Sequence, residues 1–287
     1  EWERNFPSRR GPAHKIVDYM KGDQDYITPI MTNSESIYQF GNNAYGKPAT
    51  ALNILRESVL GRELFDYAFK TYSNRWMFKH PEPADFFRTM EDASGIDLDW
   101  FWRGWFYTTD PVDIGITDVM HYKVDSRNPA VESKRRMAER DAQPEYISDI
   151  RNREKFKTIV EQDSSLADFY TYYDPLEYDL LDEREYKAYI SMLEDDEKAL
   201  LDTSNNFYTV VFENVGGLVM PLIVELHYTD GSTELHRIPA EIWRKNHEKV
   251  AKVFISKKQL ESVVLDPYLE TADIDRDNNY YPPRIQP

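Results

Sequence analysis

Residues 222–238 read LIVELHYTDGSTELHRI, and this stretch decides the fold of the second half of the chain. Apolar side chains recur at every second position from Leu222 to Tyr228, with Glu225 and His227 between them, which is the pattern of a half-buried strand. Asp230-Gly231 is a tight hairpin signal that leads into a second strand at 233–238. We therefore expect an antiparallel sheet here.

Further strand signals lie on both sides of this hairpin. β-Branched and aromatic residues are concentrated at 114–124, 207–212, 250–255 and 262–265. Between the first of these strands and the rest lies a highly charged stretch, in which we expect helical segments at 146–160, 166–173 and 183–201. Residues 111–287 are therefore predicted to form a β-sandwich-like domain with a helical acidic insertion at about 129–205.

The first 110 residues have helical rather than strand periodicity. Tyr45, Ala49, Leu52, Leu55 and Val59 recur at helical spacing before Gly61, a helix-stop residue. Leu64, Tyr67, Ala68 and Tyr72 are expected to share one face of the next helix, and Asp97 is expected to cap the last. The helices are predicted at 12–21, 45–60, 63–76, 83–94 and 98–107, with 23–43 irregular. The predicted fold class is α+β, with a helical domain at 1–110.

Composition excludes several kinds of site and partner. The 287 residues carry a formal net charge of −16, so their surface repels phosphate groups, and nucleic-acid binding is not expected. No cysteine is present, which excludes thiolate metal sites, cysteine nucleophiles and disulfides. No apolar run approaches the roughly 20 residues that span a bilayer, so we expect no membrane insertion. The chain opens at Glu1 without Met, and we expect it to be part of a longer polypeptide.

The residues that commonly bind metals are scattered. No pair among the six histidines has the HExxH spacing of a helical zinc site. His227 and His236 flank the hairpin and could face each other across two strands, although two surface histidines are the simpler interpretation. The run Asp273–Asn279 resembles the opening of a calcium loop, but Asn278 and Arg284 stand where such a loop needs Gly and Glu. A turn that hydrogen-bonds its own backbone is the alternative, and we do not expect calcium.

The residues from Gly41 to Tyr107 contain a series of short motifs in a fixed order. These are Tyr45-Gly46-Lys47-Pro48, Leu60-Gly61-Arg62-Glu63-Leu64-Phe65, His80-Pro81 with Asp85-Phe86, Ser94-Gly95-Ile96-Asp97-Leu98, and Trp100-Phe101-Trp102-Arg103-Gly104-Trp105. Each motif alone is weakly specific, but the ordered set at this spacing is specific. In this order they resemble the aminopeptidase N family of zinc peptidases, the gluzincins, over about Pro12 to Tyr107.

The resemblance implies that the helical domain is the C-terminal half of a thermolysin-like catalytic domain. In that family Tyr45 corresponds to a catalytic tyrosine, whose hydroxyl stabilises the oxyanion of the tetrahedral intermediate. Gly46 and Pro48 depart from the family, which has Glu and Gly there; Pro48 suits the first turn of a helix. We interpret Lys47 as a solvated first-turn residue. Trp100, Trp102 and Trp105 are expected to anchor their helix in the core rather than to stack on substrate.

The resemblance also implies a zinc-dependent aminopeptidase that removes N-terminal residues from peptides. Its zinc ligands and general base are expected upstream of Glu1, so this chain provides no metal ligand and should be inactive alone. A looser likeness of Ile238–Trp243 and Leu265–Pro267 to the β domain of long bacterial members implies an exported location, in the periplasm or cell envelope. The alternative is a non-catalytic relative, a binding or scaffold protein, motivated by Gly46, Pro48 and the acidic insertion.

Overall fold

The computed structural model describes residues 11–155 and 157–284. It divides into two compact units: unit 1 consists of residues 1–121 and 208–287, and unit 2 of residues 122–207. Helices occur in both units, and unit 1 also contains antiparallel sheet, so the α+β class is confirmed. The N-terminal helices and the strands fall in the same unit, whereas the sequence placed a domain boundary near residue 110.

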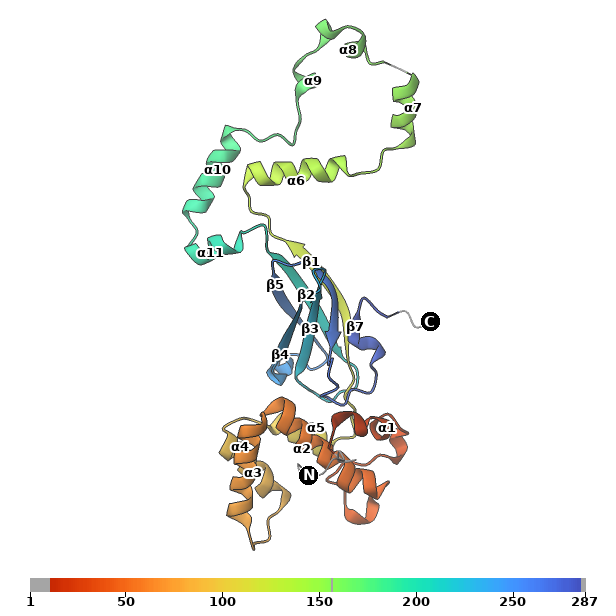
Figure 1. Ribbon diagram of the computed structural model, residues 1–287, viewed down its shortest axis with the longest axis vertical. Helices are drawn as coiled ribbons and strands as arrows, with labels where there is room; N and C mark the ends of the chain where they lie inside the picture. Colours follow the sequence, from red (N-terminus) through yellow and green to blue (C-terminus); the bar gives the residue numbers. More distant parts are fainter. Residues whose placement is uncertain (1–10, 156, 285–287) are drawn as a thin grey trace. The chain divides into compact units, whose positions relative to one another are not determined.

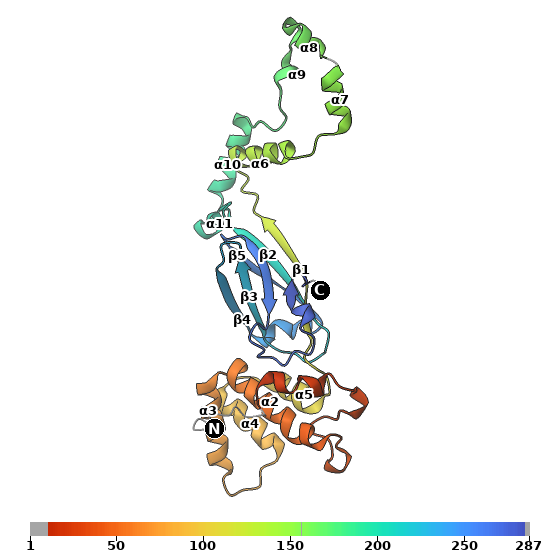
Figure 2. The same ribbon diagram turned by 45° about the vertical axis from the view of Figure 1, so that its right-hand side comes forward.

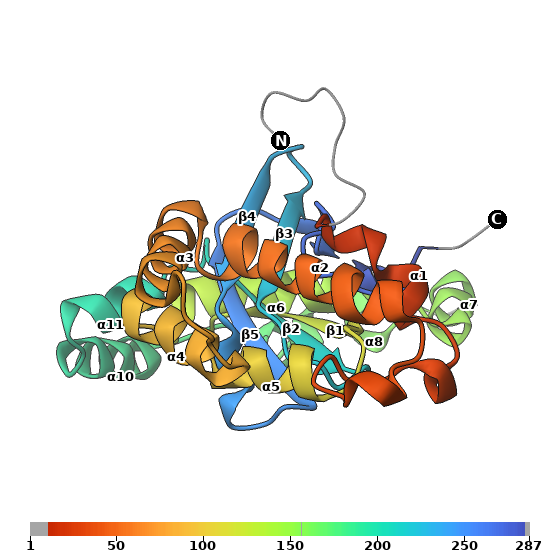
Figure 3. The ribbon, with the colours of Figure 1, turned by 90° about the horizontal axis from the view of Figure 1, so that it is seen from below.

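The N-terminal part of unit 1 is helical, and Figure 3 shows α3 beside the end of the helical run that contains α2. The segment predicted as a helix at 12–21 consists of a 3₁₀ turn, η1 (Ala13–Lys15), followed by a short α-helix, and the region expected to be irregular contains the 3₁₀ turns η2 (Gln24–Tyr26) and η3 (Ser34–Ser36). The longer elements are α1 (Val17–Met20), η4 (Asn42–Gly46), α2 (Lys47–Ile54), η5 (Leu55–Val59), α3 (Arg62–Trp76), α4 (Pro83–Ser94) and α5 (Asp99–Tyr107).

Local sequence explains how α4 begins and ends. Pro83 is in its first turn, where the missing N–H is not needed, and the Asp85 carboxylate accepts from the backbone N–H of Glu82 at 2.9 Å. Gly95 follows the last turn with φ of +68°, the left-handed conformation that favours glycine. The predicted start and stop of this helix are confirmed.

The helix that carries Tyr45 begins earlier than predicted. Two single π-helical turns, η4 and η5, flank α2, so helical structure runs from Asn42 to Val59. Tyr45 therefore lies inside η4 and does not open the helix. Pro48 is the second residue of α2, and because it has no N–H to continue an α-helical ladder, a wider turn before it is consistent with its chemistry.

Among residues 11–155 and 157–284, seven strands form two sheets. One sheet has the order β1-β2-β5 and the other β4-β3-β6-β7. Val224 pairs with His236 across the β3–β4 hairpin, and Gly231 takes φ of +80° in its turn, as expected for Asp-Gly. The strands are β1 (Ile114–Lys123), β2 (Asn206–Asn214), β3 (Leu222–Tyr228), β4 (Thr233–Ile238), β5 (Lys249–Ser256), β6 (Leu260–Leu265) and β7 (Tyr280–Tyr281).

The two sheets share one apolar core, and Figure 2 shows their strands running beside one another. Val210 and Phe212 of β2 are fully buried, as are Leu222 and Val224 of β3. These residues belong to one cluster that also includes Trp105 of α5. The helical part and the sheets are therefore one cooperative body, because an apolar core is the main source of stability in a domain.

Unit 2 consists mainly of helices and the loops that connect them, and in the sequence it joins β1 to β2. Its helix α6 was not predicted; Asn128 caps it and Pro129 opens it. Figures 1 and 2 both show α7, α8 and α9 apart from α6 and α10. The helices are α6 (Pro129–Asp141), α7 (Ile147–Lys155), α8 (Ile159–Gln162), α9 (Phe169–Tyr172), α10 (Leu180–Ser191) and α11 (Asp195–Leu200).

Two smaller predictions about helix surfaces are corrected. On α3, Phe65 and Ala68 are buried while Tyr67 is 61% exposed, so Tyr67 does not share the buried face. The N-cap residue of α5 is Leu98, one position after Asp97, although the Asp97 carboxylate still accepts from the N–H of Asp99, the first residue of the helix, at 3.1 Å. Among the described residues, no helix combines the length and apolarity that crossing a bilayer requires.

Candidate functional site

Tyr45 is positioned by its buried neighbours on either side. Asn43 and Lys47 are 0% and 1% exposed, whereas Tyr45 itself is 49% exposed. Residues two apart on a helix point to roughly opposite faces, so burying Asn43 and Lys47 turns Tyr45 toward the surface. The phenol thus stands on an anchored helix with its ring accessible.

Asn43 connects this helix to the irregular segment before it. Its amide nitrogen donates to the carbonyl oxygen of Thr28 at 2.6 Å and to that of Pro29 at 3.1 Å. A buried amide that satisfies two loop carbonyls fixes the loop against the π-helical turn. The backbone around Tyr45 is therefore held by side-chain bonds as well as by packing.

Lys47 is not the solvated residue that the sequence suggested. Its ammonium group donates to the carbonyl oxygen of Thr108 at 3.0 Å, just after the end of α5. Burial lowers the pKa of Lys47 to about 8, an effect that the negative charge of Asp110 partly opposes. A cation beside the C-terminal carbonyls of a helix is favourable, so Lys47 ties the Tyr45 helix to α5.

One exposed aromatic ring contacts Tyr45, and a second exposed aromatic pair lies in the segment that precedes it in the sequence. The ring of Phe40 meets that of Tyr45 edge-on at 5.8 Å, and Tyr26 meets Tyr38 at 5.9 Å in the same manner. Phe40, Tyr26 and Tyr38 are each more than half exposed. Such rings offer apolar surface at little conformational cost, which suits contact with another chain or a peptide.

The departure from the family pattern at Gly46 has a local explanation. A Cβ at this position would lie 3.3 Å from the Cδ1 atom of Ile16, which is itself buried. Glycine therefore allows the π-helical turn to pack closely on the residue before α1. Gly46 therefore lets the turn that carries Tyr45 lie close against Ile16.

The tryptophans of α5 mostly serve the core, as predicted. Trp105 and Trp102 are 0% and 3% exposed, and Trp102 stacks on Phe87 with ring centroids 4.7 Å apart. Trp100 is only partly buried and lines a surface hollow with Arg103. The anchoring interpretation is confirmed for Trp102 and Trp105.

The two hairpin histidines do not form a site. In the ladder, Val224 stands opposite His236 while His227 stands opposite Thr233. Residues opposite one another in a ladder point to the same face of the sheet, so His236 shares the face of Val224. His227 is an odd number of positions from Val224 along β3 and therefore points to the other face. His227 instead lies 2.7 Å from the carboxylate of Glu225.

The calcium-like run forms a turn that bonds to the backbone. The carboxylate of Asp273 accepts from the N–H groups of Ile114 and Asp275, at 3.1 and 3.0 Å. Asp275 in turn accepts from the N–H of Asp277 at 3.1 Å. These oxygens are engaged by donors, which is the pattern of Asx turns rather than of a cation site.

Three carboxylates elsewhere lie close together, although the sequence did not single them out. Glu91, Asp97 and Asp99 have oxygens within 4.8 Å of one another, and this is the one such group among residues 11–155 and 157–284. Asp97 and Asp99 are exposed, and Glu91 accepts from the N–H of Leu98 at 2.9 Å. With no histidine in it, this group does not fit a catalytic zinc.

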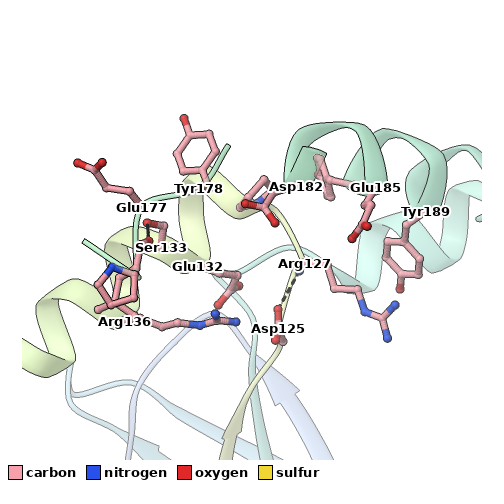
Figure 4. Close-up of a pocket in the computed structure, with 14 residues that line it drawn as sticks. Asp125, Arg127, Glu132, Ser133, Arg136, Glu177, Tyr178, Asp182, Glu185 and Tyr189 are labelled. Carbon is pink, nitrogen blue, oxygen red and sulfur yellow. Dashed lines mark hydrogen bonds between the residues drawn. The ribbon is translucent and has the colours of Figure 1, made fainter. Parts of the chain in front are cut away.

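Unit 2 contains a separate polar cavity of about 370 Å³. Figure 4 shows Arg136 and Glu132 facing it from α6 and Glu185 from α10. Glu132 is 4% exposed and accepts from both the N–H and the hydroxyl of Ser126 at 2.9 Å. Arg127 lies over the ring of Tyr189 at 4.6 Å, so the walls are held together by polar contacts.

Comparison with known proteins gives no family for this chain. A scan against family models found no match, and neither did a search of curated proteins.

Proposed function

We propose that this chain supplies the tyrosine side of a zinc aminopeptidase site, with Tyr45 as its catalytic residue. The proposal is supported by the ordered motifs from Tyr45 to Trp105 and by one structural observation. The phenol is 49% exposed on a helix whose flanking residues are buried and bonded. These bonds fix the backbone from which the Tyr45 side chain extends, and oxyanion stabilisation depends on a donor that is positioned before charge develops on the substrate.

The part of the proposed reaction that this chain supplies follows from the residues it contains. The chain contains no HExxH pattern, and its described residues hold no histidine-containing ligand group. The proposed zinc, its ligands and the general base therefore belong to another segment of the polypeptide, and zinc would polarise the substrate carbonyl there. This chain's part is to donate the Tyr45 hydroxyl to the developing oxyanion of a peptide substrate.

Substitution of the phenol tests this proposal. In a polypeptide that carries both this chain and the metal-binding segment, Tyr45→Phe should lower kcat by about 10²–10³ with little change in KM, because the bond is made in the transition state. Tyr67→Phe, at an exposed tyrosine of α3, is the matched control and should leave kcat unchanged. Full activity in Tyr45→Phe would contradict the proposal.

The isolated chain provides a second test. It should not hydrolyse an aminoacyl arylamide even when zinc is added, because it lacks the ligands that activate water. Chelator-sensitive hydrolysis by the 287-residue chain would show that the proposed division of labour is wrong.

A second candidate function is a non-catalytic binding or scaffold protein. It is favoured by the apolar side chains that unit 2 exposes, which serve no purpose in the proposed chemistry. A degenerate HExxH pattern in the metal-binding segment, together with unchanged behaviour of Tyr45→Phe, would favour this function.

A further inference from the structure

Unit 2 lacks an apolar core among its described residues. None of its apolar side chains belongs to the buried cluster, and its most buried residues are polar: Ser126, Glu132, Ser133 and Asn206. Contacts such as Arg140–Asp174 at 2.8 Å and Arg127 over Tyr189 link its elements instead. Isolated short helices are marginal in water, so helices of this kind gain stability when a partner covers their apolar side chains.

Exposed apolar side chains occur along the whole of unit 2, and four of them are aromatic residues close together in the sequence. Phe169, Tyr170, Tyr172 and Tyr173 are 67%, 80%, 77% and 55% exposed. Phe169 stacks on Tyr173 at 5.1 Å and meets Tyr170 edge-on at 5.4 Å, so these three rings form one patch. Together with Tyr172, which belongs to the same short helix as Phe169, we call this segment the aromatic turn (residues 169–173). It exposes on the order of 500 Å² of largely apolar surface, comparable to the largest patch of a typical monomer.

The aromatic turn already has a helical backbone. Asp168 and Thr171 form a reciprocal capping box, with the Thr171 hydroxyl accepting from the N–H of Asp168 at 3.2 Å. A capped helical turn presents its side chains in a fixed arrangement and therefore loses less entropy on binding. This preorganisation suits insertion into a groove.

Charge indicates the partner. Residues 158–207, here called the acidic segment, contain 14 Asp and Glu against three Lys and Arg, a formal charge of −11 out of −16 for the whole chain. Asp168 and Asp174 directly flank the aromatic turn. Nucleic acids and anionic lipids carry the same sign of charge and are repelled, as is the acidic segment of a second copy.

We propose that the aromatic turn and its acidic flanks form a docking segment for a basic protein surface, one with an apolar groove rimmed by lysine and arginine. The aromatic rings fill the groove, and the negative charge of the acidic segment attracts its basic rim, as in other recognition modes in which a helix lies in a groove. This inference does not depend on the proposed peptidase activity.

A defined probe tests it: a synthetic amphipathic helix of leucine and lysine, added to the full 287-residue chain. The peptide should bind, binding should weaken with salt, and the amides of residues 168–173 should become protected from hydrogen exchange. Phe169→Ser combined with Tyr172→Ser should weaken binding at least tenfold, since buried aromatic anchors dominate such interfaces. Tyr146→Ser combined with Ile147→Ser, at equally exposed positions outside the acidic segment, should bind as the parent does.

Four results would each overturn the proposal. The Phe169/Tyr172 variant could bind the peptide as tightly as the parent, or the amides of 168–173 could stay unprotected. Poly-lysine, which has no apolar side, could bind as well as the leucine–lysine peptide, which would make charge alone sufficient. Finally, the aromatic turn could drive self-association or binding to neutral phosphatidylcholine vesicles, which would identify a second copy or a lipid surface as its partner.

Discussion

Lys47 and Asp273 are both buried in unit 1, and burial shifts the pKa of each toward its neutral form. Lys47 is 1% exposed and Asp273 is 6% exposed. The pKa of Lys47 falls to about 8 and that of Asp273 rises to about 7, in each case mainly because the charged form is deprived of water. The two groups therefore make the stability of unit 1 depend on pH in opposite directions and in different windows.

Replacing Lys47 with methionine should remove a rise in stability at alkaline pH. Between pH of about 8 and 10.5, the unfolded chain still binds a proton that the folded chain has released, so stability increases with pH across this window. The full effect is on the order of 3 kcal/mol. We expect urea unfolding at pH 7.5 and pH 10 to show this increase in the parent and not in Lys47→Met.

The control for this experiment is Lys252→Met, at an exposed position of β5. It should keep the increase seen in the parent, since its ammonium group is hydrated in both states. If the free energy of unfolding rose with pH as much in Lys47→Met as in the parent, the rise would not come from the buried ammonium group of Lys47.

Replacing Asp273 with asparagine should act in the opposite sense. The folded chain holds a proton on Asp273 up to pH of about 7, whereas the unfolded chain loses it near pH 3.8, so stability falls as pH rises between these values. The upper limit of this loss is on the order of 4 kcal/mol. Asp273→Asn should lack that loss when unfolding is measured from pH 4 to pH 8, while Asp277→Asn, at an exposed position, should retain it.

At the scale of elements, periodicity and stop signals located most helices and strands, and tertiary context explains the errors. Helix α4 was predicted from Pro83 and Gly95, both local signals. Helix α6 was missed because it has few apolar residues and no apolar stripe, although Asn128-Pro129 is a helix-start signal. The buried face of α3 was misplaced because Phe65, rather than Tyr67, meets the core.

The environment of the candidate site was predicted only in part. Tyr45 was proposed from a series of motifs along one segment, whereas Lys47 bonds to Thr108, which is 61 positions away in the sequence. The spacing of apolar residues within one helix carries no information about a hydrogen-bond partner that far away in the sequence. The π-helical turn η4 was likewise invisible, since the same residues are compatible with an ordinary first turn.

Gly216 is required where the connection between β2 and β3 approaches the start of β1. A Cβ on Gly216 would lie 2.4 Å from the carbonyl oxygen of Pro111 and 2.8 Å from the amide nitrogen of Asp113, both backbone atoms. Gly216→Ala should therefore destabilise unit 1 by about 2 kcal/mol or more, because backbone must move to accept it. Urea unfolding measures the effect.

Gly41→Ala is the matched control. Gly41 is helical, with φ of −63°, and a Cβ there meets nothing within 4 Å. Alanine should leave stability unchanged or raise it by about 0.5–1 kcal/mol. Equal stability of the two variants would show that the connection at Gly216 is looser than the structure indicates.

At the scale of the whole molecule, unit 1 is assembled from two separated stretches of sequence. Its buried cluster includes Ile16 and Trp105 from the helices and Leu265 from β6. Glu270 accepts from both Nη atoms of Arg237 at 2.8 Å and from the hydroxyl of Ser58 at 2.9 Å, which joins the strands to the helical part. These contacts depend on none of the residues of unit 2.

Removing most of unit 2 should therefore leave unit 1 folded. β1 ends at Lys123, β2 begins at Asn206, and the two strands are neighbours in one sheet, so residues 125–204 can be replaced by a short Asn-Gly turn. Shortening the connection should stabilise unit 1 by about 2–3 kcal/mol through the lower entropy of loop closure. We expect urea unfolding of the shortened chain to show equal or greater stability, and its binding of the leucine–lysine peptide to be lost. A loss of more than about 2 kcal/mol would mean that the residues between β1 and β2 contribute to the folding of unit 1, since loop closure alone predicts a gain.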